Sequence, residues 1–174
     1  MWKELMHPAS NTKNYVADQG NRLYRRSLYV YWKRTSPHPM MTLFDAPSRE
    51  ASCVRRSRTN TPLQSLALFN EPQRVEATRK LAERLIKERK KDDARLDLLF
   101  TLVASRKPSV TEREACSKLL QSQRNRLADK AEDAEALLRI GDAPKDPDLD
   151  PMEVAAWAQV AGTALASDLS ILLY

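Results

Sequence analysis

Hydrophobic residues recur at steps of three and four through residues 61–174, which is the period of amphipathic α-helices. The pattern predicts helices at about residues 61–70, 72–90, 92–105, 111–127, 132–140 and from 151 onward. The helix at residues 92–105 is expected to be central, because leucines widen its apolar face. The last stretch contains Gln159 and Asp168 and is rich in alanine, so a buried helix is predicted there rather than a membrane span.

Polar residues that cap helices separate these stretches. Thr61-Pro62-Leu63-Gln64 marks a helix start, since proline needs no amide hydrogen there and glutamine can close a capping box. A second capping box is predicted at Thr111-Glu112-Arg113-Glu114. Gly141 is expected to end the helix before it, and Asp150-Pro151 to open the last helix.

The N-terminal third follows no such period. Residues 22–34 are predicted to form a helix, with a strand as the alternative because Tyr29, Val30 and Tyr31 favour β-structure. Residues 36–47 are predicted as an extended, irregular wrap, since Ser36-Pro37-His38-Pro39 disfavours regular structure. The expected fold is mainly α: a compact multi-helix domain spanning residues 1–174, with a basic N-terminal segment (1–60) packed on a helical bundle (61–174).

The composition and charge distribution fit a globular chain with one strongly basic segment. Of the 174 residues, 42% are hydrophobic and 30% charged, and only 3 are glycine, which disfavours glycine-rich phosphate loops. The net charge is +6, and residues 22–58 carry nine Lys/Arg against two acids, or +7, which leaves 20 basic and 21 acidic residues elsewhere, or −1. Such a patch attracts nucleic acid, acidic glycans, phospholipid or an acidic protein.

The residues that could perform chemistry are few. Histidines occur only at His7 and His38, each beside a proline and away from any nucleophile pattern, and with Cys53 and Cys116 they lack metal-ligand spacing. The two cysteines could form a disulfide or remain separate buried thiols. Asp142, Asp146, Asp148 and Asp150 lie in a proline-containing loop without the glycine turn of a calcium site, and are interpreted as a solvated loop that caps the last helix. No catalytic constellation is visible, and no metal site or cofactor is predicted for this chain.

Three arginines immediately precede the helix start at Thr61-Pro62. Arginine side chains beside the free amides of a helix N-terminus favour an anion site. The candidate site comprises Arg55, Arg56, Arg58, Thr59, Asn60 and Gln64. The alternative is a structural role, in which these arginines pair with Asp18, Asp45 and Glu50 in a partly buried network that pins the N-terminal segment and binds nothing.

A second candidate surface combines aromatic and basic residues, as in proteins that bind single-stranded nucleic acid. It comprises Tyr24, Arg25, Arg26, Trp32, Lys33 and Arg34. The alternative is that Leu28, Tyr29 and Trp32 face the core while the basic residues are solvated.

Two long segments carry a family resemblance. They read Leu23-Tyr24-Arg25-Arg26-Ser27-Leu28-Tyr29 with Trp32-Lys33-Arg34-Thr35-Ser36-Pro37, and Phe44-Asp45-Ala46-Pro47 followed by Arg55-Arg56-Ser57-Arg58-Thr59-Asn60-Thr61-Pro62-Leu63-Gln64. With Leu68-Phe69-Asn70-Glu71-Pro72-Gln73 and Trp157, the chain resembles a domain of unknown function in planctomycete-type bacterial proteins. That resemblance implies the C-terminal part of a large exported protein, periplasmic or extracellular, whose other domains often include a cytochrome-c-like one. This chain has neither a haem motif nor a visible signal peptide, and the family lends it no catalytic residues.

The leading functional hypothesis is therefore a non-catalytic interaction or scaffolding domain. Its partner would be an acidic protein, a polysaccharide or the other domains of a longer parent protein. One alternative is a nucleic-acid or polyanion-binding module that uses the same charge. The other is part of an enzyme whose active site needs further domains.

Overall fold

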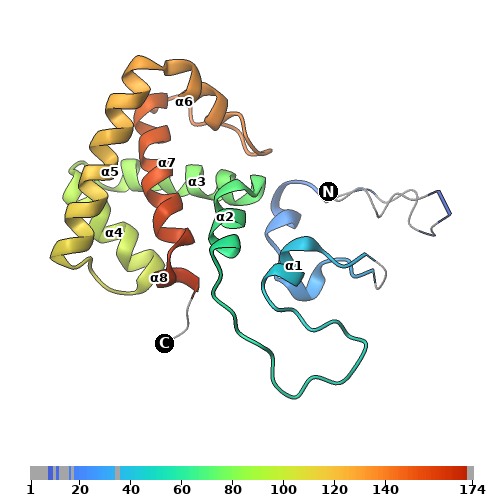
Figure 1. Ribbon diagram of the computed structural model, residues 1–174. Coiled ribbons are helices and arrows are strands. Elements are labelled where there is room, and N and C mark those ends of the chain that lie inside the picture. The colour runs from blue at the N-terminus through green and yellow to red at the C-terminus, as the bar shows by residue number, and fades with distance from the viewer. Residues whose placement is uncertain (1–7, 10, 12–15, 17, 34–35, 172–174) are drawn as a thin grey trace. The chain divides into compact units, whose positions relative to one another are not determined.

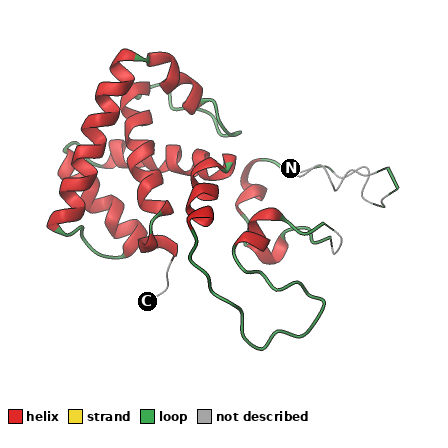
Figure 2. Cartoon of the chain, in the orientation of Figure 1, coloured by secondary structure: helices red, strands yellow, loops and turns green. Residues whose placement is uncertain are grey.

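All regular elements in the described residues are helices (Figures 1 and 2). The computed structural model describes residues 8–9, 11, 16, 18–33 and 36–171. The α-helices are α1 (Pro39–Leu43), α2 (Pro62–Asn70), α3 (Pro72–Glu88), α4 (Asp92–Ala104), α5 (Val110–Asp129), α6 (Ala131–Leu138), α7 (Pro151–Ala166) and α8 (Asp168–Ile171). Two short 3-10 helices, η2 (Gly20–Tyr24) and η3 (Ser27–Tyr29), precede them. The predicted mainly α fold is confirmed.

The chain divides into two compact units, Met1–Ala67 (unit 1) and Leu68–Tyr174 (unit 2). Unit 1 contains 11 Lys/Arg and 4 Asp/Glu, a net charge of +7, which leaves 18 and 19 for unit 2, or −1. All the excess positive charge therefore belongs to the smaller unit. The predicted packing of residues 1–60 on residues 61–174 stays a prediction.

Helix α7 is the centre of unit 2. It contacts α3, α4, α5, α6 and α8, and Trp157 and Val160 on it are fully buried. Alanine fills most of its other buried positions, which lets neighbouring helices approach closely; at Gly162 an added Cβ would already touch Thr78. The prediction that residues 92–105 form the central helix was wrong. Leu102 on α4 is 41% exposed, because only one side of that helix faces the core.

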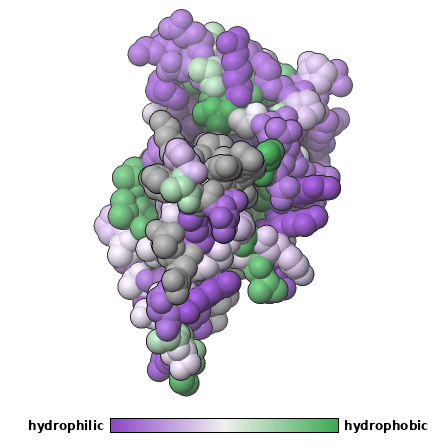
Figure 3. Space-filling model, turned by 90° about the vertical axis from the view of Figure 1, so that its right-hand side faces the viewer, coloured by the Kyte–Doolittle hydropathy of each residue, from purple (hydrophilic) through white to green (hydrophobic). Residues whose placement is uncertain are grey.

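The apolar C-terminal stretch is a buried helix, as predicted, although it is interrupted. Ser167 adopts an extended conformation between α7 and α8, and its hydroxyl donates to the Ala164 carbonyl at 2.7 Å. No described helix combines the length and apolar character needed to cross a bilayer. The face of the molecule in Figure 3 is mostly hydrophilic, with separate hydrophobic residues between the polar ones.

Of the helix ends predicted in unit 2, one is correct and two are displaced. Asp150 caps α7 by accepting from the Met152 amide at 3.1 Å, as predicted, but α6 ends at Leu138 with Arg139 as its C-cap, so Gly141, with a φ of 95°, lies beyond the cap. Helix α5, however, begins at Val110 rather than at Thr111. Its capping box joins Ser109 and Glu112, because the Ser109 hydroxyl accepts from the Glu112 amide while the Glu112 carboxylate accepts from the Ser109 amide.

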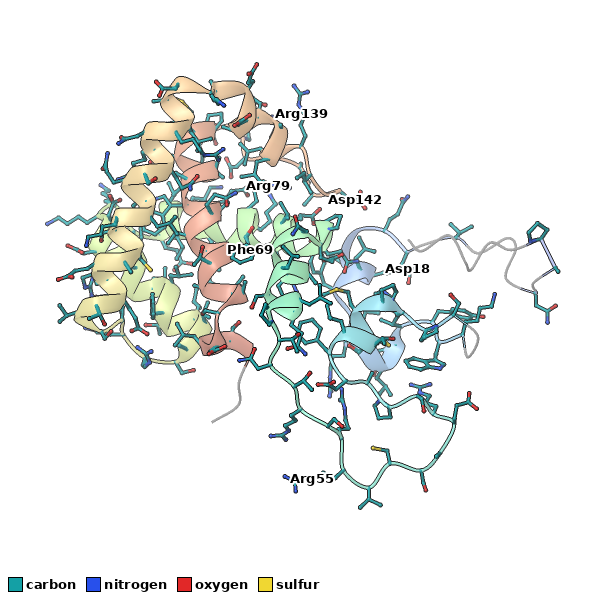
Figure 4. All side chains as sticks on the ribbon, in the orientation of Figure 1. Asp18, Arg55, Phe69, Arg79, Arg139 and Asp142 are labelled. Carbon is teal, nitrogen blue, oxygen red and sulfur yellow. The ribbon has the colours of Figure 1, made fainter. Side chains whose placement is uncertain are left out.

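The acidic loop after α6 lies on α3 and is held there by buried side chains (Figure 4). The Glu76 carboxylate accepts from the amides of Asp142 and Ala143. Arg79, only 1% exposed, donates to the carbonyls of Ala143 and Pro144 and pairs with Glu83 at 2.9 Å. A side chain at position 141 would collide with Glu76, so both the positive φ and this close approach require glycine there.

Unit 1 differs from its predicted secondary structure in two places. In the described part of the predicted helix at 22–34, which is residues 22–33, there is no continuous helix, and the 3-10 turns η2 and η3 replace it. Leu28 is 73% exposed and Tyr29 67% exposed, so this segment lacks the packed face that stabilises most protein helices. The second difference is α1, inside the predicted irregular wrap. His38 accepts from the Met40 amide at 3.2 Å and Pro39 occupies the first helical position, so the Pro-His-Pro segment begins a helix instead of preventing one.

Candidate anion-binding site

The candidate site begins at the C-terminal end of α1, where the backbone turns sharply. Asp45 has a φ of 56°, the left-handed conformation that commonly follows a helix. The Ala46 amide donates to the Met41 carbonyl at 2.8 Å and the Asp45 amide to the Thr42 carbonyl at 3.3 Å, which is the Schellman pattern. This turn directs the chain into an exposed loop that returns to α2.

Residues 56–64 bond to the carbonyl groups at that helix end. Arg56 donates through Nη2 to the Phe44 carbonyl at 3.1 Å and through Nε to the Asp45 carbonyl at 3.3 Å. Gln64 donates to the Leu43 carbonyl at 2.9 Å. Three carbonyl groups that α1 leaves without helical partners therefore receive donors from the far side of the loop.

The Asp45 carboxylate holds the loop at a second point. Its Oδ2 accepts from the Thr59 amide at 2.7 Å and from the Thr59 hydroxyl at 2.8 Å. Gln64 also donates to the Thr59 hydroxyl, at 3.1 Å, and accepts from the Thr61 amide at 3.0 Å, as the predicted capping box requires. Thr59 and Gln64, both predicted as ligand-binding residues, thus make the bonds that close the loop, and Gln64 is 1% exposed.

Arg55 and Arg58 behave differently from Arg56. Both are exposed, and neither has a hydrogen-bond or ion-pair partner among the described residues. Arg55 projects from the loop in Figure 4. Residues 55–58 line an open hollow of about 370 Å³. The neighbouring Asn60 is also exposed.

Asp18 and Asp45, which were expected to pair with these arginines, have other partners in the structure. Asp18 lies 3.7 Å from Arg22, and the Asp45 carboxylate binds Thr59 rather than an arginine. Arg56 does have a structural role, but through backbone carbonyls and at the surface rather than in a buried salt-bridge network. The three arginines therefore separate into one that stabilises the loop and two that are available to a partner.

In the second candidate surface, Trp32 contacts Arg49 of the loop between α1 and α2, a pair that the sequence did not predict. The Arg49 guanidinium lies 4.7 Å from the centroid of the Trp32 ring, a cation–π contact, with Arg49 at a φ of 64°. Trp32 and Lys33 are half-buried, whereas Tyr24, Arg25 and Arg26 are exposed. Arg34 lies outside the described residues. The expectation that Leu28 and Tyr29 face a core is wrong, because both are exposed.

Unit 2 contains a polar cluster that the sequence did not reveal: Asp92, Arg95, Arg124, Glu153 and Trp157. Glu153 accepts from Arg95 at 2.9 Å, from Arg124 at 2.6 Å and from the Trp157 indole at 3.0 Å. Arg124 also bonds both carboxylate oxygens of Asp92, which lowers the pKa of that carboxyl group. Because these groups bond to one another across α4, α5 and α7, the cluster joins the three helices. No periodicity identifies such partners, since they lie 29 and 32 residues apart.

The remaining reactive residues in the described part of the chain lie apart from one another. His38 caps α1, and His7 lies outside the described residues. Cys53 is exposed, Cys116 is half-buried, and both are free thiols. Asp146 pairs with Lys87, and the described residues contain no group of three or more potential metal ligands.

Together, the fold and this site define a mainly α-helical protein with a basic, arginine-rich loop. The chain belongs to a family of proteins of unknown function, designated PSD1 or DUF1553, whose sequence profile matches residues 1–120. The match covers all of unit 1 and continues into α5. Neither a curated protein nor a solved structure matches the chain.

Proposed function

We propose that this chain is a non-catalytic interaction domain whose residues 48–60 bind an anionic polymer, either an acidic polysaccharide or an acidic protein segment. The observation that carries the proposal is the difference among the three arginines. Arg56 is bonded to backbone carbonyls, while Arg55 and Arg58 are exposed and without partners. The bonds of Arg56 and Thr59 hold the backbone on either side of Arg58, and the exposed guanidinium groups offer planar pairs of donors to carboxylate or sulfate.

The spacing of the two available arginines favours a polymer over a small ion. Three residues of extended chain span at most about 10 Å, so Arg55 and Arg58 can contact separate anionic groups. The net charge of +7 on unit 1 would also attract a polyanion from a distance.

The parent protein is a further part of the proposal. The resemblance to planctomycete-type proteins supports an origin at the terminal end of a longer exported protein, with a periplasmic or extracellular location. Anionic polysaccharides and acidic proteins are both present there, and a scaffolding role toward other domains of the same protein is consistent with it.

A nucleic-acid partner is the second candidate, and exposed aromatic residues favour it. Tyr24 is 51% exposed and Tyr29 67% exposed, beside Arg25 and Arg26, an arrangement suited to stacking bases. If Arg25, Arg26, Arg55 and Arg58 all contact phosphates, the logarithm of the binding constant should fall linearly with the logarithm of the salt concentration, with a slope of about −3 for a single strand.

The test is the thermal midpoint of the full chain with inorganic sulfate, a sulfated polysaccharide, polyglutamate and a single-stranded oligonucleotide, each at two salt concentrations. A saturable rise with one polymer is expected, because a ligand that binds the native state stabilises it. The double variant Arg55→Gln/Arg58→Gln should lose that rise and keep the midpoint of the free protein. Arg56→Gln should lower the midpoint without ligand. A polymer-induced rise that survives in the double variant would refute the proposal.

A further inference from the structure

Residues 48–60 form the longest exposed segment between the described helices of the chain. Every one of these residues is exposed, and no regular secondary structure occurs between α1 and α2. Exposed loops of this kind are preferred sites of proteolytic cleavage, because a protease must bind several consecutive residues in extended conformation.

Hydrogen bonding within the loop is concentrated on its C-terminal side. Thr59 is held through its amide and hydroxyl groups, and Arg56 through two bonds of its guanidinium. Residues 51–55 make no hydrogen bond within the described part of the chain. Arg55 is therefore the last residue of a stretch without hydrogen bonds, and its side chain has no partner among the described residues. The peptide bond between Arg55 and Arg56 ends this stretch.

Four other described arginines of unit 1 are less suitable for cleavage. Arg25 and Arg26 lie between η2 and η3, where the Tyr29 amide donates to the Arg26 carbonyl at 2.9 Å. Arg49 has a positive φ and its guanidinium is on Trp32. In the peptide bond after Arg58, the Thr59 amide donates a hydrogen bond to the Asp45 carboxylate.

We propose that the Arg55–Arg56 peptide bond is a processing site for an arginine-directed serine protease, one whose S1 pocket carries a carboxylate. Water is added across this bond, so that Arg55 gains a C-terminal carboxylate and Arg56 gains a free amino group. No oxidant or cofactor is needed. The proposal is independent of the anion-binding function, since it depends on backbone accessibility rather than on a ligand.

The test is digestion of the full, folded chain with a small amount of trypsin, with the earliest products identified by intact mass. The expected first products are residues 1–55 and 56–174. Arg55→Gln should slow the disappearance of intact chain by about tenfold, since cleavage requires an accessible segment that fits the pocket. Arg55→Lys should restore the cut, because lysine also fits an acidic pocket.

Arg58→Gln is the matched control, because Arg58 is the other exposed and partnerless arginine of the loop. The Arg58→Gln variant should still be cut first after residue 55, and its intact chain should disappear at a rate within about twofold of that of the natural chain. The proposal is overturned if the earliest cut follows any residue other than Arg55. It is equally overturned if Arg55→Gln leaves the rate unchanged.

Discussion

Asp45 occupies a left-handed position that glycine commonly fills at the end of a helix. Aspartate tolerates this conformation better than most residues, and here its carboxylate also accepts two hydrogen bonds from Thr59. One side chain therefore ends α1 and closes the loop that carries the available arginines. The sequence showed Asp45 only as a potential partner for arginine, because the contact with Thr59 joins residues 14 apart.

Two substitutions at position 45 separate these contributions. Asp45→Ala removes the bonds to Thr59 and places a Cβ in a left-handed conformation, so it should lower the free energy of unfolding by about 2 kcal/mol. Asp45→Gly loses the same bonds without the conformational strain and should cost about 1 kcal/mol less. Urea denaturation measures both, and amide exchange at Thr59 should accelerate in each. Equal losses for the two variants would show that the positive φ carries no strain.

Glu112 gives unit 2 a defined sensitivity to acid. Its bidentate contact with Arg106, together with the Ser109 amide, lowers the pKa of the Glu112 carboxyl from 4.5 to about 2. A carboxyl group with a lowered folded-state pKa stabilises the fold above its unfolded pKa and loses that contribution as the pH falls. Stability should therefore decrease between pH 4.5 and pH 2.

Glu112→Gln should flatten this part of the stability curve, as measured by denaturant unfolding at a series of pH values. Glu114→Gln is the control, since the Glu114 side chain is exposed and has no ion-pair or hydrogen-bond partner among the described residues. An unchanged slope in Glu112→Gln would mean that other carboxyl groups, such as that of Asp92, account for the acid sensitivity.

At the scale of elements, the sequence predicted helices well where hydrophobic periodicity was strong and caps were unambiguous. Residues 72–88 and 151–166 formed as expected because their apolar faces pack on each other. Prediction failed where a short signal had two readings. Pro37-His38-Pro39 suggested an irregular segment, but α1 begins there. The basic segment at 22–34 was predicted to be helical, but its apolar residues Leu28 and Tyr29 are exposed and give a helix no packed face.

Two substitutions at the start of α5 test which residue caps this helix. Ser109→Ala should lower the free energy of unfolding by about 1 kcal/mol, because it removes the hydroxyl that accepts from the Glu112 amide. Thr111→Ala should change it by less than about 0.5 kcal/mol, since the exposed Thr111 hydroxyl bonds the Ser109 hydroxyl at 3.1 Å but accepts from no backbone amide. Thermal or chemical denaturation distinguishes the two. A larger loss for Thr111→Ala would place the cap where the sequence first suggested it.

At the scale of the whole molecule, the chain combines a basic unit with a nearly neutral one. The sequence revealed this asymmetry directly, because charge can be counted along the chain. It also indicated the three arginines of the candidate site. It could not show that Arg56 bonds to carbonyls while Arg55 and Arg58 do not, since that depends on where α1 ends. The centrality of α7 and the contact between Trp32 and Arg49 were hidden for the same reason: tertiary packing decides them.

The central claim is that the basic unit contains a specific anion-binding loop rather than diffuse positive charge. The most direct test is the affinity of two double variants for a sulfated polysaccharide, measured by calorimetry at constant salt. Arg55→Gln/Arg58→Gln and Arg25→Gln/Arg26→Gln remove the same charge from unit 1. We predict that the first weakens binding about tenfold or more and the second by less than about threefold, since direct guanidinium contacts contribute more than long-range attraction. Equal weakening by both variants would contradict the account, because it would show that net charge alone attracts the polymer.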